Sequence, residues 1–281
     1  MPSRRFVQCD VFSPVPTQGN GLAVVVDADG LDDEAMQRFA AWTNLAETTF
    51  LLPPRDPRAD YRLRIYTPVR EIPFAGHPTL GSCAAWLHTG HTPQTPGTVR
   101  QECGVGVVDI DTSQGETLAF VAPPTQIAPL ADDDLAAIVA ALAIPRQAIV
   151  ATAQLDNGAL RQVLQLDSAT RVLAVDGSRV RWPAFKPIGL LGAHPPGGEC
   201  HYEVRMLAPS SGMSEDPITG SLIAALAHWL QREGKLHGPL AVAQGTALGR
   251  RGRVSVRPTA QGGAIFVGGR VHVLIEGTLM L

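Results

Sequence analysis

Glu47 is a carboxylate at the start of an apolar segment, over 48–52, and it follows directly after an expected helix. A carboxyl group held against apolar side chains has a raised pKa and can exchange a proton near neutral pH. Such a group can take a proton from one carbon of a ligand and return it to another. The alternative interpretation is a helix-end carboxylate held in a salt bridge.

Two glycines, Gly76 and Gly220, each precede a polar residue, His77 and Ser221, at the expected start of a helix. Glycine lets backbone N–H groups approach a ligand, and a helix N-terminus offers unpaired donors and a partial positive charge. Two such ends that face one cleft would bind the carboxylate of a small molecule. Taken alone, His77 is typical of a residue beside a helix N-cap, and Ser221 of an ordinary helix start.

Asp216 lies four residues before Gly220. Paired with His77 across a cleft, it would hold a substrate in one tautomer and assist proton movement. Taken alone, it is typical of a carboxylate near a helix N-terminus. The sequence around Ser221 is not Gly-x-Ser-x-Gly, which disfavours a hydrolase nucleophile, and Cys103-Gly104-Val105-Gly106 lacks the third glycine of a nucleotide-binding loop.

An internal repeat relates the two halves of the chain. Residues 61–68 match 202–209 at Tyr, Arg and Pro, and 71–76 match 215–220 at Glu, Pro and Gly. Trp86-Leu87 then matches Trp229-Leu230 at nearly the same offset, close to half the length. Three matches in the same order indicate a duplicated, two-domain chain, with halves 1–121 and 122–281 joined near 121–131. The alternative is two unrelated strand–helix units with common turn residues.

The elements that must position these residues are short strands and a few helices. In the first half we expect strands over 5–12, 22–26, 47–52 and 61–66, two or three more between 98 and 121, and helices over 32–44 and 79–88. In the second half we expect strands over 147–153, 161–166, 202–207, 240–243, 253–256, 264–267 and 271–275, and helices from 132 to before Pro145 and over 221–232. Substrate specificity is expected to lie in loops such as 53–60 and 187–198.

Composition excludes several classes of partner. The chain has 281 residues, of which 45% are hydrophobic and 17% charged, with a formal net charge of −3. That balance gives a packed core and no strong basic field for nucleic acid or an anionic membrane. No apolar run reaches transmembrane length, and the first residues lack the apolar stretch of a signal peptide, so we expect a soluble cytoplasmic protein.

The cysteines and histidines do not suggest a metal centre. Four cysteines, Cys9, Cys83, Cys103 and Cys200, lie far apart without a CxxC pair, and the eight histidines show no HExxH or HxH spacing. We therefore expect reduced thiols and no metal ion.

Five motifs, in order, resemble the PhzF-like isomerase family, which shares the fold of diaminopimelate epimerase. They are Asp10-Val11-Phe12, Gly19-Asn20-Gly21-Leu22-Ala23-Val24-Val25, Asn44-Leu45-Ala46-Glu47-Thr48-Thr49-Phe50, Gly76-His77-Pro78-Thr79-Leu80 and Glu215-Asp216-Pro217-Ile218-Thr219-Gly220-Ser221. The resemblance implies an α+β fold of two pseudo-symmetric domains, each a mixed, mostly antiparallel sheet wrapped around a central helix. It also implies an active-site cleft between the domains, a homodimer, and proton transfer without a cofactor.

The resemblance also implies the site residues. The catalytic glutamate of the family falls on Glu47, and its histidine, aspartate and serine fall on His77, Asp216 and Ser221. Asn20, Gly76 and Gly220 are expected to bind the substrate. One departure is Gly21, where the family usually has proline after Gly-Asn.

The related epimerases use two cysteines as paired acid and base, but neither helix start here carries a cysteine, since Cys83 lies within the expected helix. The sequence therefore predicts an isomerase in which Glu47 moves a proton on a small carboxylate-bearing substrate. Two alternatives remain: an amino-acid epimerase or racemase on the same fold, and a binding protein that keeps the cleft without turnover.

Overall fold

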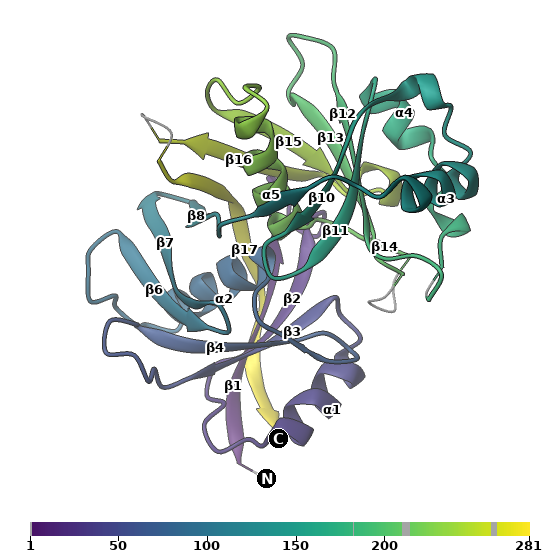
Figure 1. The fold of residues 1–281 in the computed structure, drawn as a ribbon. Helices are drawn as coiled ribbons and strands as arrows, with labels where there is room; N and C mark the ends of the chain where they lie inside the picture. The colour runs from purple at the N-terminus through teal and green to yellow at the C-terminus, as the bar shows by residue number, and fades with distance from the viewer. Residues whose placement is uncertain (1, 182, 210–213, 260–262) are drawn as a thin grey trace. The chain divides into compact units, whose positions relative to one another are not determined.

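The structure is a computed structural model that describes residues 2–181, 183–209, 214–259 and 263–281. Its internal contacts divide it into two compact units (Figure 1). Unit 1 combines the chain up to Val121 with Gly268–Leu281, and unit 2 is Ala122–Val267. The sequence division also falls after Val121, but it assigns 268–281 to the second half, whereas their contacts lie in unit 1.

Unit 1 is a mixed sheet around one buried helix. Its strands are β1 (Ser3–Val11), β2 (Asn20–Val25), β3 (Glu47–Leu52), β4 (Tyr61–Tyr66), β5 (Glu71–Ile72), β6 (Thr98–Cys103), β7 (Gly106–Gln114) and β8 (Thr117–Val121), and its helices are α1 (Asp33–Thr43) and α2 (Gly76–His88). The final strand, β17 (Ile265–Met280), pairs with both β1 and β8. The ladder of strand pairs therefore returns to its start, with α2 packed against strands on several sides.

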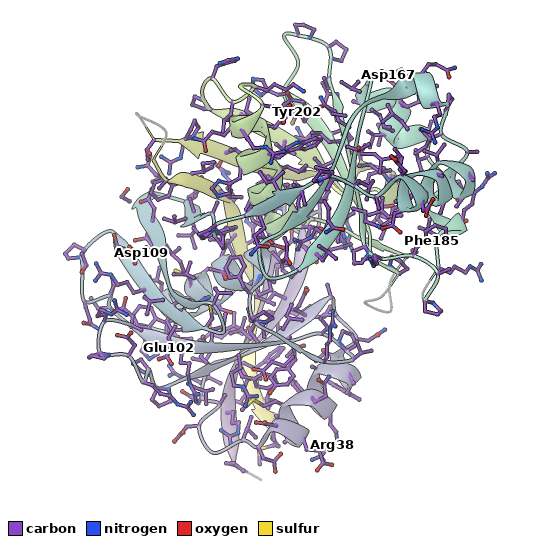
Figure 2. All side chains as sticks on the ribbon, in the orientation of Figure 1. Arg38, Glu102, Asp109, Asp167, Phe185 and Tyr202 are labelled. Carbon is purple, nitrogen blue, oxygen red and sulfur yellow. The ribbon has the colours of Figure 1, made fainter. Side chains whose placement is uncertain are left out.

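Small side chains allow α2 to sit inside this sheet. Most of the helix is buried, and only Ala84, Leu87 and His88 are partly or fully open to solvent. A Cβ atom on Gly81 would lie 2.5 Å from Cδ2 of Leu22 on β2, so only glycine permits this close approach of helix and strand. The peripheral helix α1 is different, because its outer face carries an exposed Glu34–Arg38 ion pair (Figure 2).

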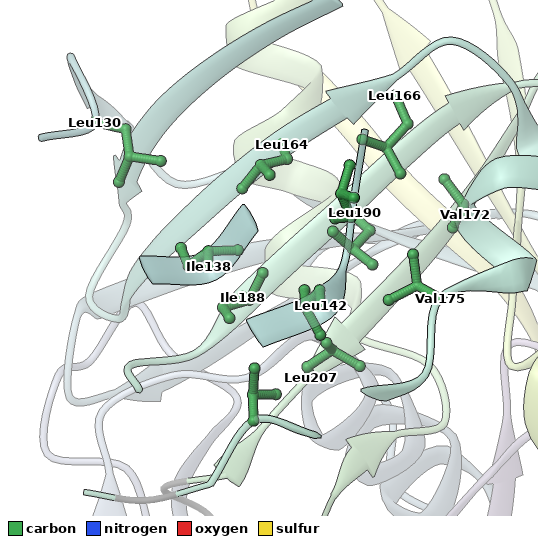
Figure 3. Close-up of a cluster of buried hydrophobic side chains, with 12 residues drawn as sticks. Leu130, Ile138, Leu142, Leu164, Leu166, Val172, Val175, Ile188, Leu190 and Leu207 are labelled. Atoms are coloured by element: carbon green, nitrogen blue, oxygen red, sulfur yellow. The ribbon is translucent and has the colours of Figure 1, made fainter. Parts of the chain in front are cut away.

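Unit 2 has its own sheet, central helix and core. Its strands are β9 (Gln126–Ala128), β10 (Ile149–Asp156), β11 (Leu160–Leu166), β12 (Ile188–Ala193), β13 (Tyr202–Leu207), β14 (Glu215–Asp216), β15 (Leu240–Gln244) and β16 (Gly252–Pro258), and its helices are α3 (Asp132–Leu142), α4 (Ala169–Ala174) and α5 (Gly220–Arg232). Ile138 and Leu142 of α3 pack on Leu164 and Leu190 of β11 and β12 (Figure 3). Burial of such branched apolar side chains is the main driving force for this core.

The two units repeat one order of strand pairings. In unit 1, β2–β3 and β4–β6 are parallel pairs, and β3–β4 and β6–β7 are antiparallel pairs. In unit 2, β11–β12 and β13–β15 are the parallel pairs, and β12–β13 and β15–β16 the antiparallel ones. A short strand and then a 13-residue central helix follow β4 and β13 alike. Both units are thus sheet-dominated α+β folds with the same topology.

The matched residues of the sequence repeat include an ion pair that recurs in both units. Arg64 on β4 donates to Glu71 on β5 at 2.7 and 2.6 Å. Arg205 on β13 donates through the same two nitrogens to Glu215 on β14 at 3.0 and 2.7 Å. The first pair is partly exposed, while the second is buried. In each unit this ion pair therefore holds together the two antiparallel strands that lead into the central helix.

Several sequence-predicted elements have the bounds that the structure shows, but two predictions were wrong. The expected separate strands at 264–267 and 271–275 form one continuous strand, β17. The expected loop at 187–198 contains β12, which pairs in parallel with β11 and is buried over Ile188–Leu191. Among the described residues, no helix has both the length and the apolar character needed to cross a membrane.

Candidate active site

Asn20, Glu47 and His77 come together in unit 1. The parallel pairing of β2 with β3 aligns Leu22 with Glu47, so the two strands begin at the same edge of the sheet. His77 lies in the first turn of α2, which packs against both strands. Oε2 of Glu47 lies 3.3 Å from Nε2 of His77, and Nδ2 of Asn20 lies 3.2 Å from Nδ1 of the same ring.

The histidine in this cluster is neutral. Burial lowers the pKa of His77 from its ordinary value of 6.5 to about 3, because a charged ring would lose its hydration. The Asn20 amide nitrogen can only donate, so Nδ1 accepts and the single ring proton is on Nε2. Nε2 lies beside the Glu47 carboxyl group, but the two atoms do not make a hydrogen bond in this geometry. His77 is therefore a neutral polar neighbour of Glu47.

Asn20 is held in place by the turn that precedes it. The buried carboxylate of Asp10 accepts the N–H of Gly19 at 3.0 Å. A Cβ atom on Gly19 would lie 2.4 Å from the Val11 carbonyl oxygen, so the turn requires glycine at this position. The family that the sequence resembles usually has proline at position 21. With Gly21 there instead, the Asn20 side chain still contacts His77.

Asp216 belongs to a buried polar cluster in unit 2. Its carboxylate accepts the hydroxyl hydrogen of Thr219 at 2.6 Å. The Gln244 side chain on β15 accepts the Thr219 N–H at 2.9 Å and donates to the Asp216 carbonyl at 3.2 Å. These bonds fix Asp216 and Thr219 just before the first turn of α5.

Ser221 in the first turn of α5 contacts a residue that sequence reasoning missed. Nη2 of Arg161 on β11 donates to Oγ of Ser221 at 2.7 Å, and Nη1 donates to Oδ1 of Asn157 at 2.9 Å. The Asn157 amide in turn donates to the Ser221 carbonyl at 2.8 Å. The sequence signal is a single charged residue in a strand that otherwise holds apolar residues and glutamines. This arginine belongs to no motif.

Both helix starts leave their backbone donors uncapped by side chains. Neither Ala75 nor Thr219, the N-cap residues of α2 and α5, accepts an N–H group from its helix through its side chain. The backbone N–H groups of Gly76 and Gly220 therefore stand in the first turns of uncapped helices, which suits an anionic ligand.

Two buried cysteines are held as thiols, and the described residues form no metal site. Burial raises the pKa of Cys9 to about 12 and also raises that of Cys83, which keeps both as thiols at neutral pH. Within the described ranges, no group of three or more histidine, cysteine, aspartate or glutamate side chains is placed to hold a metal ion.

The fold is shared with solved structures that include a hydroxyproline epimerase. A hydroxyproline epimerase from Agrobacterium vitis matches the structure with a TM-score of 0.65 at 13% identity, covering 99% of this chain and 91% of that one. A PhzF-family phenazine biosynthesis protein from Bacillus anthracis matches with a TM-score of 0.82 at 21% identity, covering both chains completely. At these identities the likeness is one of fold.

Sequence comparison gives the family. The model of the PhzC-PhzF family, described as phenazine biosynthesis-like protein, matches residues 9–277, and the chain belongs to this family. It is 31% identical over 284 residues to trans-2,3-dihydro-3-hydroxyanthranilate isomerase of Pseudomonas aeruginosa, with 99% of each chain covered. It is 36% identical over 299 residues to antisense-enhancing sequence 1 of Schizosaccharomyces pombe, again with 99% of each covered. The chain is thus an isomerase of the PhzF type.

Proposed function

We propose that this isomerase moves a proton between two carbons of a small carboxylate-bearing substrate, with Glu47 as the acid and base. The observation that carries the proposal is the position of Glu47, whose Oε2 lies 3.3 Å from Nε2 of a neutral, buried His77. In the proposed reaction the ring N–H turns toward this oxygen, and the other carboxylate oxygen takes the proton. General acid–base catalysis of this kind contributes about 10²–10⁴-fold to rate.

In this proposal residues of both clusters contribute to the reaction. Glu47 and His77 belong to the cluster of unit 1, and Asp216 and Ser221, in unit 2, are further catalytic and binding groups. Asn20 and the backbone at Gly76 and Gly220 complete the binding groups. The shared order of strand pairings and the matching helix starts support two homologous halves, which we propose as 1–121 and 122–281.

For the substrate we propose a cyclic carboxylic acid, with or without an amino substituent. Relatives carry the name trans-2,3-dihydro-3-hydroxyanthranilate isomerase, which describes a ring with a carboxylate and an amino group. Moving a proton between ring carbons shifts a double bond and needs no redox partner, so we propose a reaction without a cofactor.

We further propose a cytoplasmic homodimer. Cys9, Cys83, Cys103 and Cys200 are all free, which suits a reducing compartment. On β17, Leu274, Ile275 and Met280 are 42%, 52% and 62% exposed, and such apolar side chains are typical of an interface. We expect the wild-type protein to sediment as a dimer and the Ile275→Lys variant to sediment as a monomer.

The proposed reaction is tested by incubating the enzyme with a panel of carboxylates in heavy water. Mass spectrometry then reports any deuterium gained at carbon, and chromatography reports a new isomer. We expect exchange and isomer formation with a cyclic substrate, both lost in Glu47→Gln. Glu34→Gln, an exposed carboxylate on α1, is the matched control and should keep full activity. Full activity in Glu47→Gln would overturn the role of Glu47.

The same experiment separates the alternatives. Exchange at one carbon with inversion of its configuration, and no shifted double bond, would identify an epimerase or racemase. Binding of carboxylates with no exchange at all would identify a binding protein.

A further inference from the structure

Arg161 is a buried arginine with unsatisfied hydrogen-bonding capacity. Its side chain is 4% exposed, and its donors serve Asn157, Ala159 and Ser221 through Nη1 and Nη2. Its Nε atom is buried and has no hydrogen-bond partner. A buried donor without a partner destabilises a fold, so such atoms at a ligand site point to a group that binds there.

Arg161 also lacks the carboxylate that a buried arginine normally has. Arg205, the other buried arginine on a strand of unit 2, is held by both oxygens of Glu215. Within the described part of the chain, no ion pair joins Arg161 to a carboxylate, although the charges of Asp216 and Asp156 act on it from further away. Burial lowers the pKa of Arg161 to about 10, which still leaves it charged at neutral pH. The site therefore holds a cation that an anionic ligand would neutralise.

The contact with Arg161 also decides what Ser221 can do. The serine oxygen accepts from Nη2 at 2.7 Å, and its own hydrogen remains for donation. An uncapped helix N-terminus lies in the same turn. The first turn of α5 thus offers a hydroxyl donor, a guanidinium Nε–H and backbone N–H groups, all of which suit a carboxylate.

The equivalent turn of α2 has the opposite character. His77 there is neutral, and its neighbour Glu47 is a carboxyl group. A carboxylate placed against Arg161 would be attracted by the charge of the guanidinium group. The two helix starts match in backbone but differ in charge.

We propose that Arg161 makes the first turn of α5 the subsite for the substrate carboxylate. This inference rests on the proposed function and refines it, because it assigns the carboxylate to only one of the two helix starts. Arg161 is the binding residue, and through its bond to Ser221 it is also a positioning residue for the hydroxyl.

The test compares binding of a carboxylate with that of its neutral amide. Anthranilate and anthranilamide share one ring and one amino group, and their affinities are measured by ligand-observed NMR titration. We expect the wild-type protein to prefer anthranilate. In Arg161→Met that preference should fall at least tenfold, while anthranilamide binding stays within about threefold. Arg161→Lys keeps the charge and should retain most of the preference.

The outcomes of this binding test can be told apart from those of the test of Glu47. Glu47→Gln should bind anthranilate at least as tightly as the wild-type protein, even though it has lost exchange activity. Three results would overturn the inference: no preference for anthranilate in the wild-type protein, the same preference in Arg161→Met, or an equal loss for both ligands in Arg161→Lys. The last result would show that the arginine serves only the fold.

Discussion

Nε2 of His77 lies 3.3 Å from Oε2 of Glu47, and the histidine is buried and neutral. A neutral ring whose proton is on Nε2 has no free lone pair on that atom, so His77 is not a second base beside Glu47. A single base suits the transfer of one proton between two carbons on one face of a substrate. Racemisation with two opposed bases would need a second base.

Neutral His77 makes the stability of the protein depend on pH. Its pKa is about 3 in the folded protein and 6.5 ordinarily, so between these values only the unfolded chain binds the proton. The free energy of unfolding should have its full value above pH 6.5. Below pH 6.5 it should fall by up to about 1.4 kcal/mol per pH unit. Urea unfolding at pH 5 and 7 should show this slope reduced in His77→Gln. His88→Gln, exposed on the same helix, should keep it.

The recurring ion pairs allow one substitution to be compared in two environments. Arg205→Met leaves the buried carboxylate of Glu215 uncompensated and should cost about 3–5 kcal/mol of stability. Arg64→Met breaks the partly exposed equivalent and should cost about 1 kcal/mol or less. Urea titrations followed by circular dichroism measure both losses, and equal losses would contradict the assigned difference in burial.

Gly19→Ala should damage the site through the backbone. The new Cβ atom would meet the Val11 carbonyl at 2.4 Å and Asp10 Oδ1 at 2.8 Å, which forces the turn and Asn20 to move. A displacement of about 1 Å at a catalytic group can cost about 10²-fold in rate, and the exchange assay should show a loss of this order. At Gly238 no atom lies within 4 Å of a new Cβ, so Gly238→Ala should behave like the wild-type protein.

Alkylation of the thiols should leave the activity intact. Burial raises the pKa of all four cysteines, so few thiolates are present at neutral pH. Treatment with iodoacetamide, followed by intact mass and by the exchange assay, should give slow modification without loss of turnover. Inactivation that parallels alkylation of Cys83 would instead favour a thiol mechanism.

Local signals were sufficient for much of the fold. The bounds of α1 follow from Asp32, whose side chain accepts the Ala35 N–H, and from Asn44, which adopts the left-handed conformation that ends helices. The strand Tyr61–Tyr66 alternates buried and partly buried residues, as its apolar pattern predicts. Motif resemblance selected Glu47 and His77, which the structure brings together.

Packing between distant parts of the chain determines features that the local sequence does not predict. Gly268 looked like a break between strands, yet a Cβ there would lie 2.5 Å from the Leu118 carbonyl, so the glycine admits a neighbouring backbone and the strand continues. Arg161 carries no local pattern at all. Its importance follows from burial and from its contact with a serine 60 residues away, and both are products of the folded chain.

The path of β17 has a consequence for the order in which the protein can be made. Unit 2 is one continuous stretch of chain, Ala122–Val267, whereas unit 1 needs Gly268–Leu281 beside β1. During synthesis the second unit can therefore gather all of its strands while the first still waits for its last one. The residues of β1 are translated before the whole of unit 2, but they find their β17 partners only after unit 2 has been made.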